Sequence, residues 1–446
     1  MNVSIVGTGY VGLVSGVCLA SKGHDVVCID VVPEKVERIN AGDPPIYELG
    51  LEKMLKELVA AGKLRATTGL QDAVLNSDLS LIAVGTPFDG SAIDLKFIRQ
   101  VSKEIGEALA KKDSYHVVIV KSTVVPGTTE DVVLPILEEY SGKKAGVDFG
   151  VGMNPEFLKE GEAIADFMEP DRIVLGGIDE RSIDTLDELY ACFPNTDKIR
   201  TSPRTAEMIK YAANSLLATL ISFSNEMANL CTKVGNVDVV DVLRGVCLDK
   251  RFSPIMEDGR RVTPSMVTYV EAGCGFGGSC FPKDVKALIE FGERKHSSMQ
   301  LLRSVIDINL DQPNRLIELI KRHHESVRGL KVAVLGIAFK PGTDDVRESP
   351  ALSVIRNLRD NGAVVRAYDP IAIETGREEL GDDGIEYAES MQACVADADV
   401  VVLVTRWPEF GELPAMIAGR QSPPLVVDGR RMINKTDVGA YEGVGL

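Results

Sequence analysis

Residues 275–284, GFGGSCFPKD, place a cysteine between a glycine-rich stretch and a lysine–aspartate pair. The small residues before the cysteine would let the backbone approach a ligand closely. The neighbouring Lys283 favours the thiolate, which is the nucleophilic form of cysteine. Free cysteines are commonly buried small hydrophobic residues, and we expect this of the other seven. The context of Cys280 favours a nucleophile instead, although Pro282 and Asp284 are also typical of a helix start.

A dinucleotide-binding fingerprint stands at the N-terminus. GTGYVG at residues 7–12 follows the apolar run Val3–Val6 and precedes a predicted helix. Its three glycines permit a tight turn, the close approach of a diphosphate and the packing of helix on strand. Asp30, 18 residues beyond Gly12, ends the next predicted strand and would accept from ribose hydroxyls, which favours NAD over NADP. A redox cofactor and an activated cysteine together can oxidise a carbon past the aldehyde stage.

Residues in three other places suggest chemistry but allow simpler interpretations. Gly85-Thr86-Pro87 ends a later predicted strand and either lines the cofactor or forms a plain turn. Glu156 and Glu160 lie four apart in what looks like a capped helix start at Asn154, so they either handle water or favour the helix dipole.

The third place is a predicted long helix. Glu207, Lys210 and Asn214 share one of its faces among apolar neighbours. Polar groups are costly to bury without partners. The lysine would therefore either stabilise a developing oxyanion or form a structural pair along the helix.

Composition excludes several classes of protein. The chain has 446 residues and a net charge of −17, which argues against nucleic-acid binding and predicts two or three domains. It shows no signal peptide and no apolar run of about 18 residues. The eight cysteines form no CxxC pair and fit a reducing cytoplasm, and the five histidines lack metal-ligand spacing, so we expect no metal.

The order of predicted elements indicates two α/β domains. Short apolar runs at 3–6, 26–30, 79–84 and 117–120 alternate with helical stretches, as in a doubly wound sheet. Residues 204–233 contain no Gly or Pro and predict one long helix, buried on several sides, that joins domains, forms a dimer interface, or both. A second set of strands is expected at 331–335, 364–369, 398–405 and 425–427, with Ser349-Pro350 starting a helix.

The motifs resemble those of the UDP-glucose/GDP-mannose dehydrogenase family over essentially the whole chain. They are GTGYVG (7–12), VGTP (84–87), KSTVVPGT (121–128), NPEFLKEG (154–161), AEMIKYAAN (206–214), GFGGSCFPKD (275–284) and LGIAFKPGTDDVRES (335–349). The resemblance implies two Rossmann-like doubly wound domains joined by a long central helix. The expected division is an NAD-binding domain at 1–200, a helical dimerisation domain with the catalytic Lys and Cys at 201–300, and a nucleotide-sugar-binding domain at 320–446.

The resemblance also implies a four-electron, NAD-dependent oxidation of a nucleotide sugar at C6, with site residues carried over by motif. The catalytic set is Cys280, Lys210, Asn214, Asp284, Glu156 and Thr123. The cofactor set is Gly7, Gly9, Tyr10, Val11, Gly12, Asp30, Lys35, Gly85, Thr86, Pro87, Thr123 and Lys283. The substrate set is Glu156, Phe157, Leu158, Glu160, Lys210, Asn214, Arg251, Arg261, Phe276, Gly277, Phe339, Lys340 and Arg431, with Arg347 on the same side.

Some alternatives stay open. Residues 258–264 look like an insertion, and either Arg251 or Arg261 would enter the site of the partner in a homodimer. UDP-glucose is the favoured substrate, because residues 171–177 and Phe281 are similar to enzymes for UDP-glucose. Residues 141–149 are similar to enzymes for GDP-mannose, and a UDP-N-acetylhexosamine is a third possibility. A two-electron hydroxyacid dehydrogenase would need neither Cys280 nor a second nucleotide-binding domain. A nucleotide-sugar sensor would have a damaged catalytic set.

Overall fold

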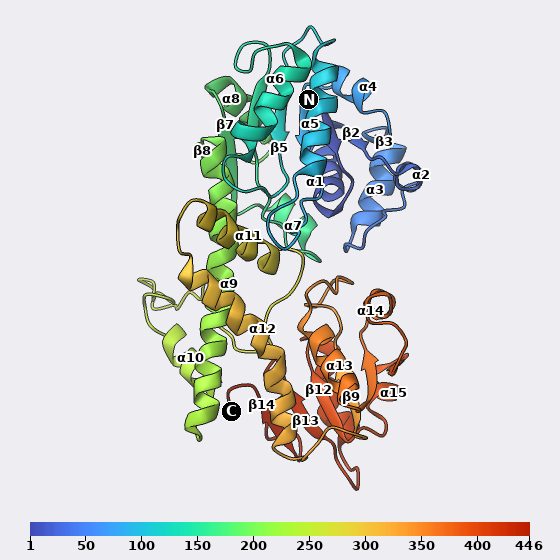
Figure 1. Ribbon diagram of the computed structural model, residues 1–446, viewed down its shortest axis with the longest axis vertical. Coiled ribbons are helices and arrows are strands. Elements are labelled where there is room, and N and C mark those ends of the chain that lie inside the picture. The colour runs from blue at the N-terminus through green and yellow to red at the C-terminus, as the bar shows by residue number, and fades with distance from the viewer. The chain divides into compact units, whose positions relative to one another are not determined.

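The computed structural model describes all residues from Met1 to Leu446. The chain separates into two compact units, Met1–Ala213 and Asn214–Leu446. Helix α9 (Pro203–Val234), the long green helix of Figure 1, begins in the first unit and ends in the second. None of the helices combines the length and apolar composition needed to cross a membrane.

The first unit is built on an eight-stranded sheet in the order β3-β2-β1-β4-β5-β6-β7-β8. All neighbours run parallel except β6 and β7. The first five positions have the winding of a dinucleotide-binding fold. The strands are β1 (Asn2–Val6), β2 (Asp25–Ile29), β3 (Leu64–Thr67), β4 (Leu79–Ile82), β5 (Val117–Val120), β6 (Gly150–Met153), β7 (Arg172–Gly177) and β8 (Asp197–Thr201).

Helices cover both faces of this sheet, because alternate strand residues point to opposite cores. Val3 and Ile5 of β1 belong to one apolar cluster, whereas Val6 belongs to the other. Burial on both faces explains why the strands are almost wholly apolar. The helices are α1 (Tyr10–Ser21), α2 (Pro33–Asn40), α3 (Leu51–Ala60), α4 (Leu70–Leu75), α5 (Lys96–Leu109), the π-helical turn η1 (Thr129–Val133), α6 (Leu134–Ser141), α7 (Ala163–Met168) and α8 (Glu180–Leu189).

The second unit carries a six-stranded parallel sheet in the order β11-β10-β9-β12-β13-β14. Its strands are β9 (Lys331–Leu335), β10 (Val364–Tyr368), β11 (Ile385–Tyr387), β12 (Val400–Leu403), β13 (Leu425–Asp428) and β14 (Tyr441–Gly443). Besides α9, its helices are α10 (Val239–Cys247), η2 (Ser265–Tyr269), α11 (Phe281–Arg294), α12 (Gln300–Lys321), α13 (Pro350–Asp360), α14 (Ile373–Leu380), α15 (Met391–Val395), η3 (Pro408–Glu412) and α16 (Leu413–Ile417). The expected fold class, with two Rossmann-like sheets and a long central helix, is confirmed.

Helix α9 is less covered than its composition suggests. Its predicted length is confirmed to within a residue at each end. Burial on several sides was expected, but Leu216, Phe223 and Leu230 are 54 %, 45 % and 54 % exposed. They recur every seven residues and so form one apolar stripe along the helix.

The first turn of the second sheet resembles the fingerprint turn in its backbone geometry, but its N–H groups already donate to a side chain of the protein. Gly336 has the same φ as Gly7, +98°, and a Cβ there would meet Thr405 atoms within 2.6 Å, so glycine is required at this position. Asp369, at the end of β10, occupies the place that Asp30 has after β2. Its carboxylate accepts from the backbone N–H groups of 337, 338, 371 and 372 and from the Trp407 indole. Asp369 therefore braces the turn rather than offering a free oxygen to a ribose.

Replacing Asp369 by Ala should destabilise the second unit by about 3 kcal/mol, or about 6 to 12 °C in its unfolding midpoint, because five buried donors lose their acceptor. Thermal unfolding followed by circular dichroism measures this. Asp30→Ala, which removes a half-buried carboxylate with fewer donors, should shift the midpoint much less. Equal midpoints for Asp369→Ala and the wild type would contradict the bracing role.

Candidate active site

The fingerprint turn of the first unit has the geometry that a diphosphate requires. Gly7 has φ +98°, and a Cβ there would lie 2.7 Å from the carbonyl oxygen of Ala83. A Cβ on Gly12 would lie 1.9 Å from the Gly7 oxygen, so that glycine is needed for packing. At Gly9 a Cβ would meet nothing, and α1 begins immediately after it. The open side of the turn and the helix N-terminus together fit an anionic dinucleotide.

Asp30 lies against this turn. Its Oδ2 accepts from the backbone N–H of Thr8 at 3.0 Å and from the Thr8 hydroxyl at 2.5 Å, and Oδ1 accepts from Val32 N at 3.1 Å. Burial raises the pKa of Asp30, but these hydrogen bonds and the charge of Lys35 more than offset it, so the pKa lies below its usual range. An ionised, half-buried carboxylate next to the turn suits a ribose with free hydroxyls and disfavours a 2′-phosphate.

The ends of β4 and β5 are fastened together beside the turn. The hydroxyl of Thr86 donates to the carbonyl of Thr123 at 2.8 Å, and the hydroxyl of Ser122 donates to Val84 O at 2.7 Å. Gly85 lies between them with no atom within 4 Å of where a Cβ would be. The two loops expected at the cofactor therefore form one edge. Pro87 continues the segment after β4, whereas Val11 lies in the first turn of α1.

Tyr10 of the fingerprint forms hydrogen bonds with a distant segment, which the motif itself does not predict. Its hydroxyl donates to a carboxylate oxygen of buried Glu48 and accepts from the N–H of Gly161 at 2.8 Å. Glu48 also accepts from Gly161 N at 2.7 Å and from Ala163 N at 2.9 Å, at the start of α7. Burial, reinforced by Glu48, raises the pKa of Tyr10, which keeps its proton for this bond. The first residue of α1 thus fastens the loop that contains Leu158 and Glu160.

A buried ion pair forms the charged centre of the first unit. Glu156 Oε1 lies 2.8 Å from Lys210 Nζ, and both side chains are almost fully buried. Burial raises the pKa of Glu156, but the charge and hydrogen bond of Lys210 and the charge of Lys121 bring the pKa below its usual value. The carboxylate is therefore ionised at neutral pH. Phe157 packs its ring beneath the cations of Arg172 and Lys210.

The helix start expected at Asn154 is wrong. Residues 154–159 form no helix, and α7 begins only at Ala163. Side chains take the backbone groups that a helix would use: Glu156 Oε2 accepts from Leu158 N, and Asp166 accepts from Lys159 N. Glu156 and Glu160 therefore do not share a helix face.

Glu207 is a site residue that sequence reasoning noticed but did not explain. It is fully buried on α9, and its carboxylate accepts from the N–H groups of Gly127 and Thr129 and from the Thr129 hydroxyl. This joins the segment after Thr123 to α9, one turn before Lys210. Burial raises the pKa of Glu207 to about 7, in spite of these three donors.

In the second unit, side chains of other elements form hydrogen bonds with the backbone of residues 273–276, and these bonds hold the cysteine loop (residues 273–280) from several sides. Asn225 of α9 accepts from Gly273 N at 2.8 Å. Asn309 of α12 accepts from Phe276 N at 2.8 Å and donates to Phe276 O at 2.9 Å. The guanidinium of Arg430, from the turn after β13, donates to Gly275 O at 3.0 Å. The loop is thus positioned by two helices and by the nearby sheet.

Two glycines of this loop are needed for the protein's own packing. A Cβ on Gly277 would lie 2.3 Å from the Glu348 oxygen. A Cβ on Gly278 would lie 2.8 Å from the ring of Phe339. The motif at 335–349 and the cysteine loop therefore pack directly on each other.

Cys280 stands at the N-cap of α11, half-buried, with its Sγ 3.5 Å from the Ser279 hydroxyl. The positive end of a helix dipole stabilises a thiolate. One turn into α11, buried Asp284 accepts from Lys283 Nζ at 2.6 Å and from Asn214 Nδ2 at 2.6 Å. The helix-start interpretation of Pro282 and Asp284 is correct, and the same residues form a polar cluster next to the cysteine. Of the other seven cysteines, five are buried as expected, but Cys192 and Cys247 are partly exposed.

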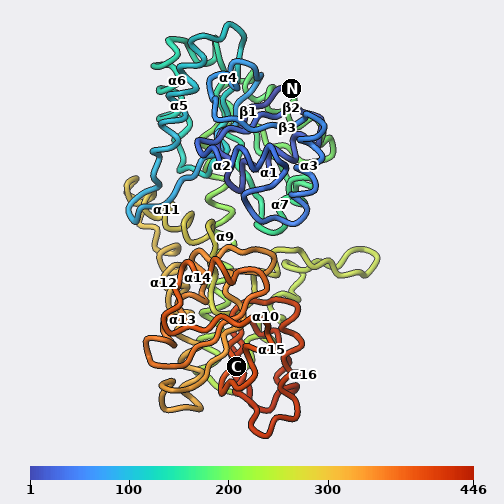
Figure 2. Tube along the Cα trace, turned by 90° about the vertical axis from the view of Figure 1, so that its right-hand side faces the viewer, coloured from blue at the N-terminus to red at the C-terminus, as the bar shows by residue number.

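The expected substrate arginines have partners. The insertion forms a short hairpin through a bridge of Ile255 with Arg261, which Figure 2 shows projecting from its unit. Arg261 donates to the carbonyls of Leu248 and Ser253 and so closes the hairpin. The side chain of Arg251 is 85 % exposed and pairs with Asp249. Arg431 pairs with Asp238 at 2.9 Å and bonds Val444 O, and the ammonium of Lys340 lies 5.9 Å from the ring of Phe339.

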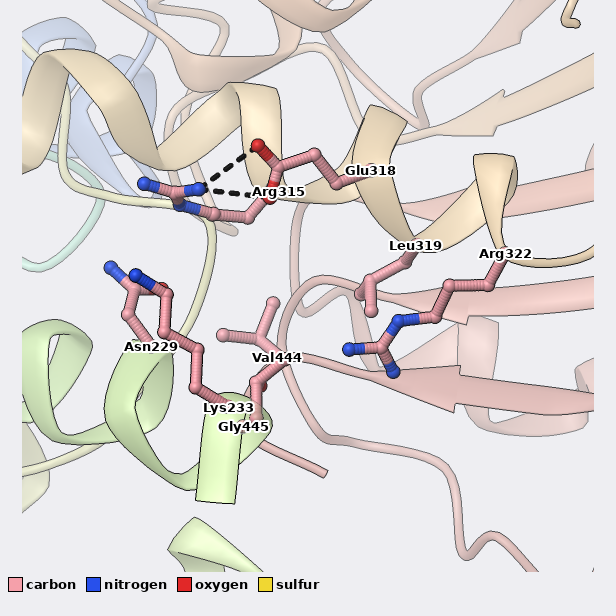
Figure 3. Close-up of a pocket in the computed structure, with 9 residues that line it drawn as sticks. Asn229, Lys233, Arg315, Glu318, Leu319, Arg322, Val444 and Gly445 are labelled. Carbon is pink, nitrogen blue, oxygen red and sulfur yellow. Dashed lines mark hydrogen bonds and ion pairs between the residues drawn. The ribbon is translucent and has the colours of Figure 1, made fainter. Parts of the chain in front are cut away.

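A cavity of about 220 Å³ lies in the second unit between α9, α12 and β14. Figure 3 shows Arg315, Arg322 and Lys233 around it. Arg315 pairs with Asp311 and Glu318, and Arg322 pairs with Glu442. Its charges are therefore largely balanced, and none of the expected site residues lines it.

The expected catalytic residues fall into two groups, one in each unit. Glu156 is brought to Lys210, and Thr123 lies at the fastened edge beside the cofactor turn. Asn214 is brought to Asp284, next to Cys280. Lys210 and Asn214 are one turn apart on α9, which therefore carries a residue of each group.

Three models of one family match this chain in succession. They are described as the NAD binding domain (residues 1–194), the central domain (204–311) and the UDP binding domain (333–435) of the UDP-glucose/GDP-mannose dehydrogenase family. The chain belongs to the UDP-glucose/GDP-mannose dehydrogenase family. Its fingerprint turn thus lies in the family's NAD-binding domain, and Cys280 in the central domain.

Relatives within the family match over the full length. UDP-glucose 6-dehydrogenase AglM of Haloferax volcanii is 41 % identical over 449 residues, covering 100 % of both chains. The solved UDP-glucose dehydrogenase of Pyrobaculum islandicum is 41 % identical, with a TM-score of 0.90 over 99 % of this chain and 97 % of that one. The GDP-mannose dehydrogenase of Pseudomonas aeruginosa is 37 % identical, with a TM-score of 0.55 over 100 % of both chains.

Replacing Glu48 by Gln should loosen the loop before α7, because an amide cannot accept from Tyr10, Gly161 and Ala163 together. Hydrogen–deuterium exchange in the segment 158–165 should accelerate by about tenfold or more. Glu52→Gln, which breaks an exposed pair with Lys56 on α3, is the matched control. Unchanged exchange in Glu48→Gln would show that the loop is held by other contacts.

Proposed function

We propose that the chain is an NAD-dependent UDP-glucose 6-dehydrogenase, which oxidises the C6 alcohol of UDP-glucose to the carboxylate of UDP-glucuronate. The observation that carries the proposal is the cysteine at the start of α11, beside the Asp284–Asn214–Lys283 cluster, in a chain with NAD-binding and UDP-binding domains. A two-electron dehydrogenase would need no such nucleophile, and a sensor would need no complete catalytic set.

The chemistry would run in two oxidations. Bound NAD would supply the hydride acceptor for both oxidations at C6, and the alcohol loses a proton in the first. The Cys280 thiolate adds to the aldehyde carbon, and the thiohemiacetal gives up the second hydride to become a thioester. Water then hydrolyses the thioester, which releases the acid and restores the thiol. A sulfur adduct prevents a reactive aldehyde from escaping between the two steps.

The other proposed catalytic residues would each act at one step of this reaction. Lys210 and Asn214 stabilise the oxyanions that form at C6. Thr123 and Asp284 hold an ordered water and take the proton of the alcohol. Glu156, ionised beside Lys210, serves as the base for thioester hydrolysis, and Glu160 supports the site. Phe157 and Leu158 would contact the sugar from the same loop.

UDP-glucose is favoured over the alternatives by the relatives. The UDP-glucose dehydrogenase of Pyrobaculum islandicum is closer in structure, with a TM-score of 0.90, than the GDP-mannose dehydrogenase, with 0.55. Several relatives near 40 % identity are named UDP-glucose 6-dehydrogenase. The nucleotide would bind at the second sheet. The residues proposed there are Phe276, Gly277, Phe339, Lys340, Arg347 and Arg431.

A homodimer would use the apolar stripe of α9. Val240 and Val246 of α10, the next helix along the chain, are also exposed. Exposed apolar surface of this extent favours a partner, and a second copy brings an identical stripe. Arg251 would reach the partner's site, because its guanidinium is exposed whereas that of Arg261 closes the hairpin. The eight free cysteines favour a reducing cytoplasm for this assembly.

Replacing Cys280 by Ser should abolish acid formation, because a serine hydroxyl is a much weaker nucleophile than a thiolate, so that no thiohemiacetal and no thioester form. Product analysis with UDP-glucose should find less than about one per cent of wild-type UDP-glucuronate, while NAD binding by calorimetry stays unchanged. Cys274→Ser, at a buried cysteine of the same loop, is the control for the loop itself. Full turnover in Cys280→Ser would rule out the covalent route.

Replacing Leu230 by Asp should weaken dimerisation at least about 30-fold, because symmetry buries the carboxylate twice. Sedimentation velocity measures the shift from dimer to monomer. Leu310→Asp, at an exposed leucine of α12 outside the stripe, should leave the dimer intact. A monomeric wild type, or a dimeric Leu230→Asp variant, would contradict the interface.

A further inference from the structure

Lys121 is a buried lysine with no part in the function so far. It follows β5, is 3 % exposed, and opens the KSTVVPGT segment. Its ammonium donates to the side-chain oxygen of Asn154 at 2.9 Å, and the Asn154 carbonyl lies 3.4 Å away. A buried ammonium is costly unless it has a task or a charged partner.

Asn154 transmits this contact to the neighbouring strands. Its amide donates to Val174 O of β7 at 2.9 Å, and its oxygen also accepts from the Tyr190 hydroxyl at 2.6 Å. Asn154 is thus held on three sides at the end of β6. Glu156, two residues later, is held in turn by Lys210 and by Leu158 N.

The charges around Glu156 come from two elements. Lys210 reaches it from α9, and Lys121 acts on it from the segment after β5. Burial lowers the pKa of Lys121 to about 8, the charge of Glu156 opposing this and that of Lys210 reinforcing it, so Lys121 is mostly protonated at neutral pH. The titratable Tyr190 reaches the group only through Asn154, and burial raises its pKa, so it stays neutral. The buried group therefore holds two positive charges and one negative charge.

We propose that Lys121 is a positioning residue for the proposed base Glu156, which it fixes through Asn154 and keeps ionised by supplying a second positive charge. The proposal rests on the role proposed for Glu156. Without Lys121, only Lys210 and the N–H of Leu158 would offset the effect of burial on this carboxylate. The second cation also leaves the group with a net positive charge, which favours an oxyanion at C6.

The test separates charge from hydrogen bonding at position 121. Lys121→Gln keeps a donor for Asn154 but removes the charge, and Lys121→Arg keeps the charge. The pH profile of kcat, at saturating UDP-glucose and NAD, is measured from pH 3.5 to 9, because the pKa of Glu156 is lowered and the hydrolysis step that Glu156 would serve enters kcat. In Lys121→Gln the acid limb should move about one unit to higher pH, because a carboxylate without its neighbouring cation has a raised pKa. In Lys121→Arg the limb should keep its wild-type position even if the rate falls.

Two controls make the result specific. Lys112→Gln removes another buried lysine of the same unit, which donates to the Val74 and Leu75 carbonyls. Tyr190→Phe removes a neutral bond to Asn154. Both should leave the limb in place. If Lys121→Gln does not fold, Lys121→Met is measured instead, with the same expected shift.

If Lys121→Gln lowers the rate equally at every pH and does not shift the acid limb, the proposal is wrong and the role of Lys121 is structural. Failure of the proposed function gives a different result. Glu156→Gln should lack the acid limb altogether. If Glu156→Gln keeps it, the role of Glu156 is wrong, whatever the behaviour of Lys121.

Discussion

The ion pair between Glu156 and Lys210 is the interaction on which the rest of the first unit's site depends. Both groups are taken almost completely out of water, at 6 % and 4 % side-chain exposure. Removing either partner would leave an unpaired buried charge, which costs about 3 to 5 kcal/mol. The loop after β6 and the first turns of α9 are therefore fixed to each other by the charges that the proposed chemistry uses.

The same constraint recurs wherever a polar group of the site is buried. Asp284 is buried at the start of α11 and is met by Lys283 and Asn214. Glu207 is buried on α9 and is met by three donors of the segment 127–129. Because a buried charge must find partners, each of these residues also joins two segments that are distant in sequence. Helix α9 carries a member of all three groups, namely Lys210, Asn214 and Glu207.

Periodicity and turn chemistry predicted most of the fold. The strands Val117–Val120 and Lys331–Leu335 agree with the structure, and so does the helix that begins after Ser349, because an apolar run, a cap and a proline are local signals. Strands β3, β6, β7, β8, β11 and β14 were not anticipated. Several of them are short, and β6 contains two glycines, so their place is set by pairing with neighbouring strands rather than by their own residues.

The site was predictable where a motif specifies a residue type, and not where a partner decides its role. Cys280 and the fingerprint glycines stand out in the sequence. Nothing local shows that Glu48 accepts from the start of α7, or that Lys121 reaches Asn154, because both contacts join distant segments. The helix wrongly expected at Asn154 has the same cause, since the Glu156 and Asp166 side chains take backbone donors that the sequence pattern assigns to a helix.

The measurement that tests the account most directly is the number of NADH molecules formed per UDP-glucose consumed, with UDP-glucose limiting and with GDP-mannose and UDP-N-acetylhexosamines in parallel. Two NADH per UDP-glucose, with little turnover of the others, is the predicted result. It would establish the four-electron oxidation and the substrate together. One NADH per UDP-glucose would mean that Cys280 does not carry the second oxidation, and no NADH with UDP-glucose would contradict the proposed substrate.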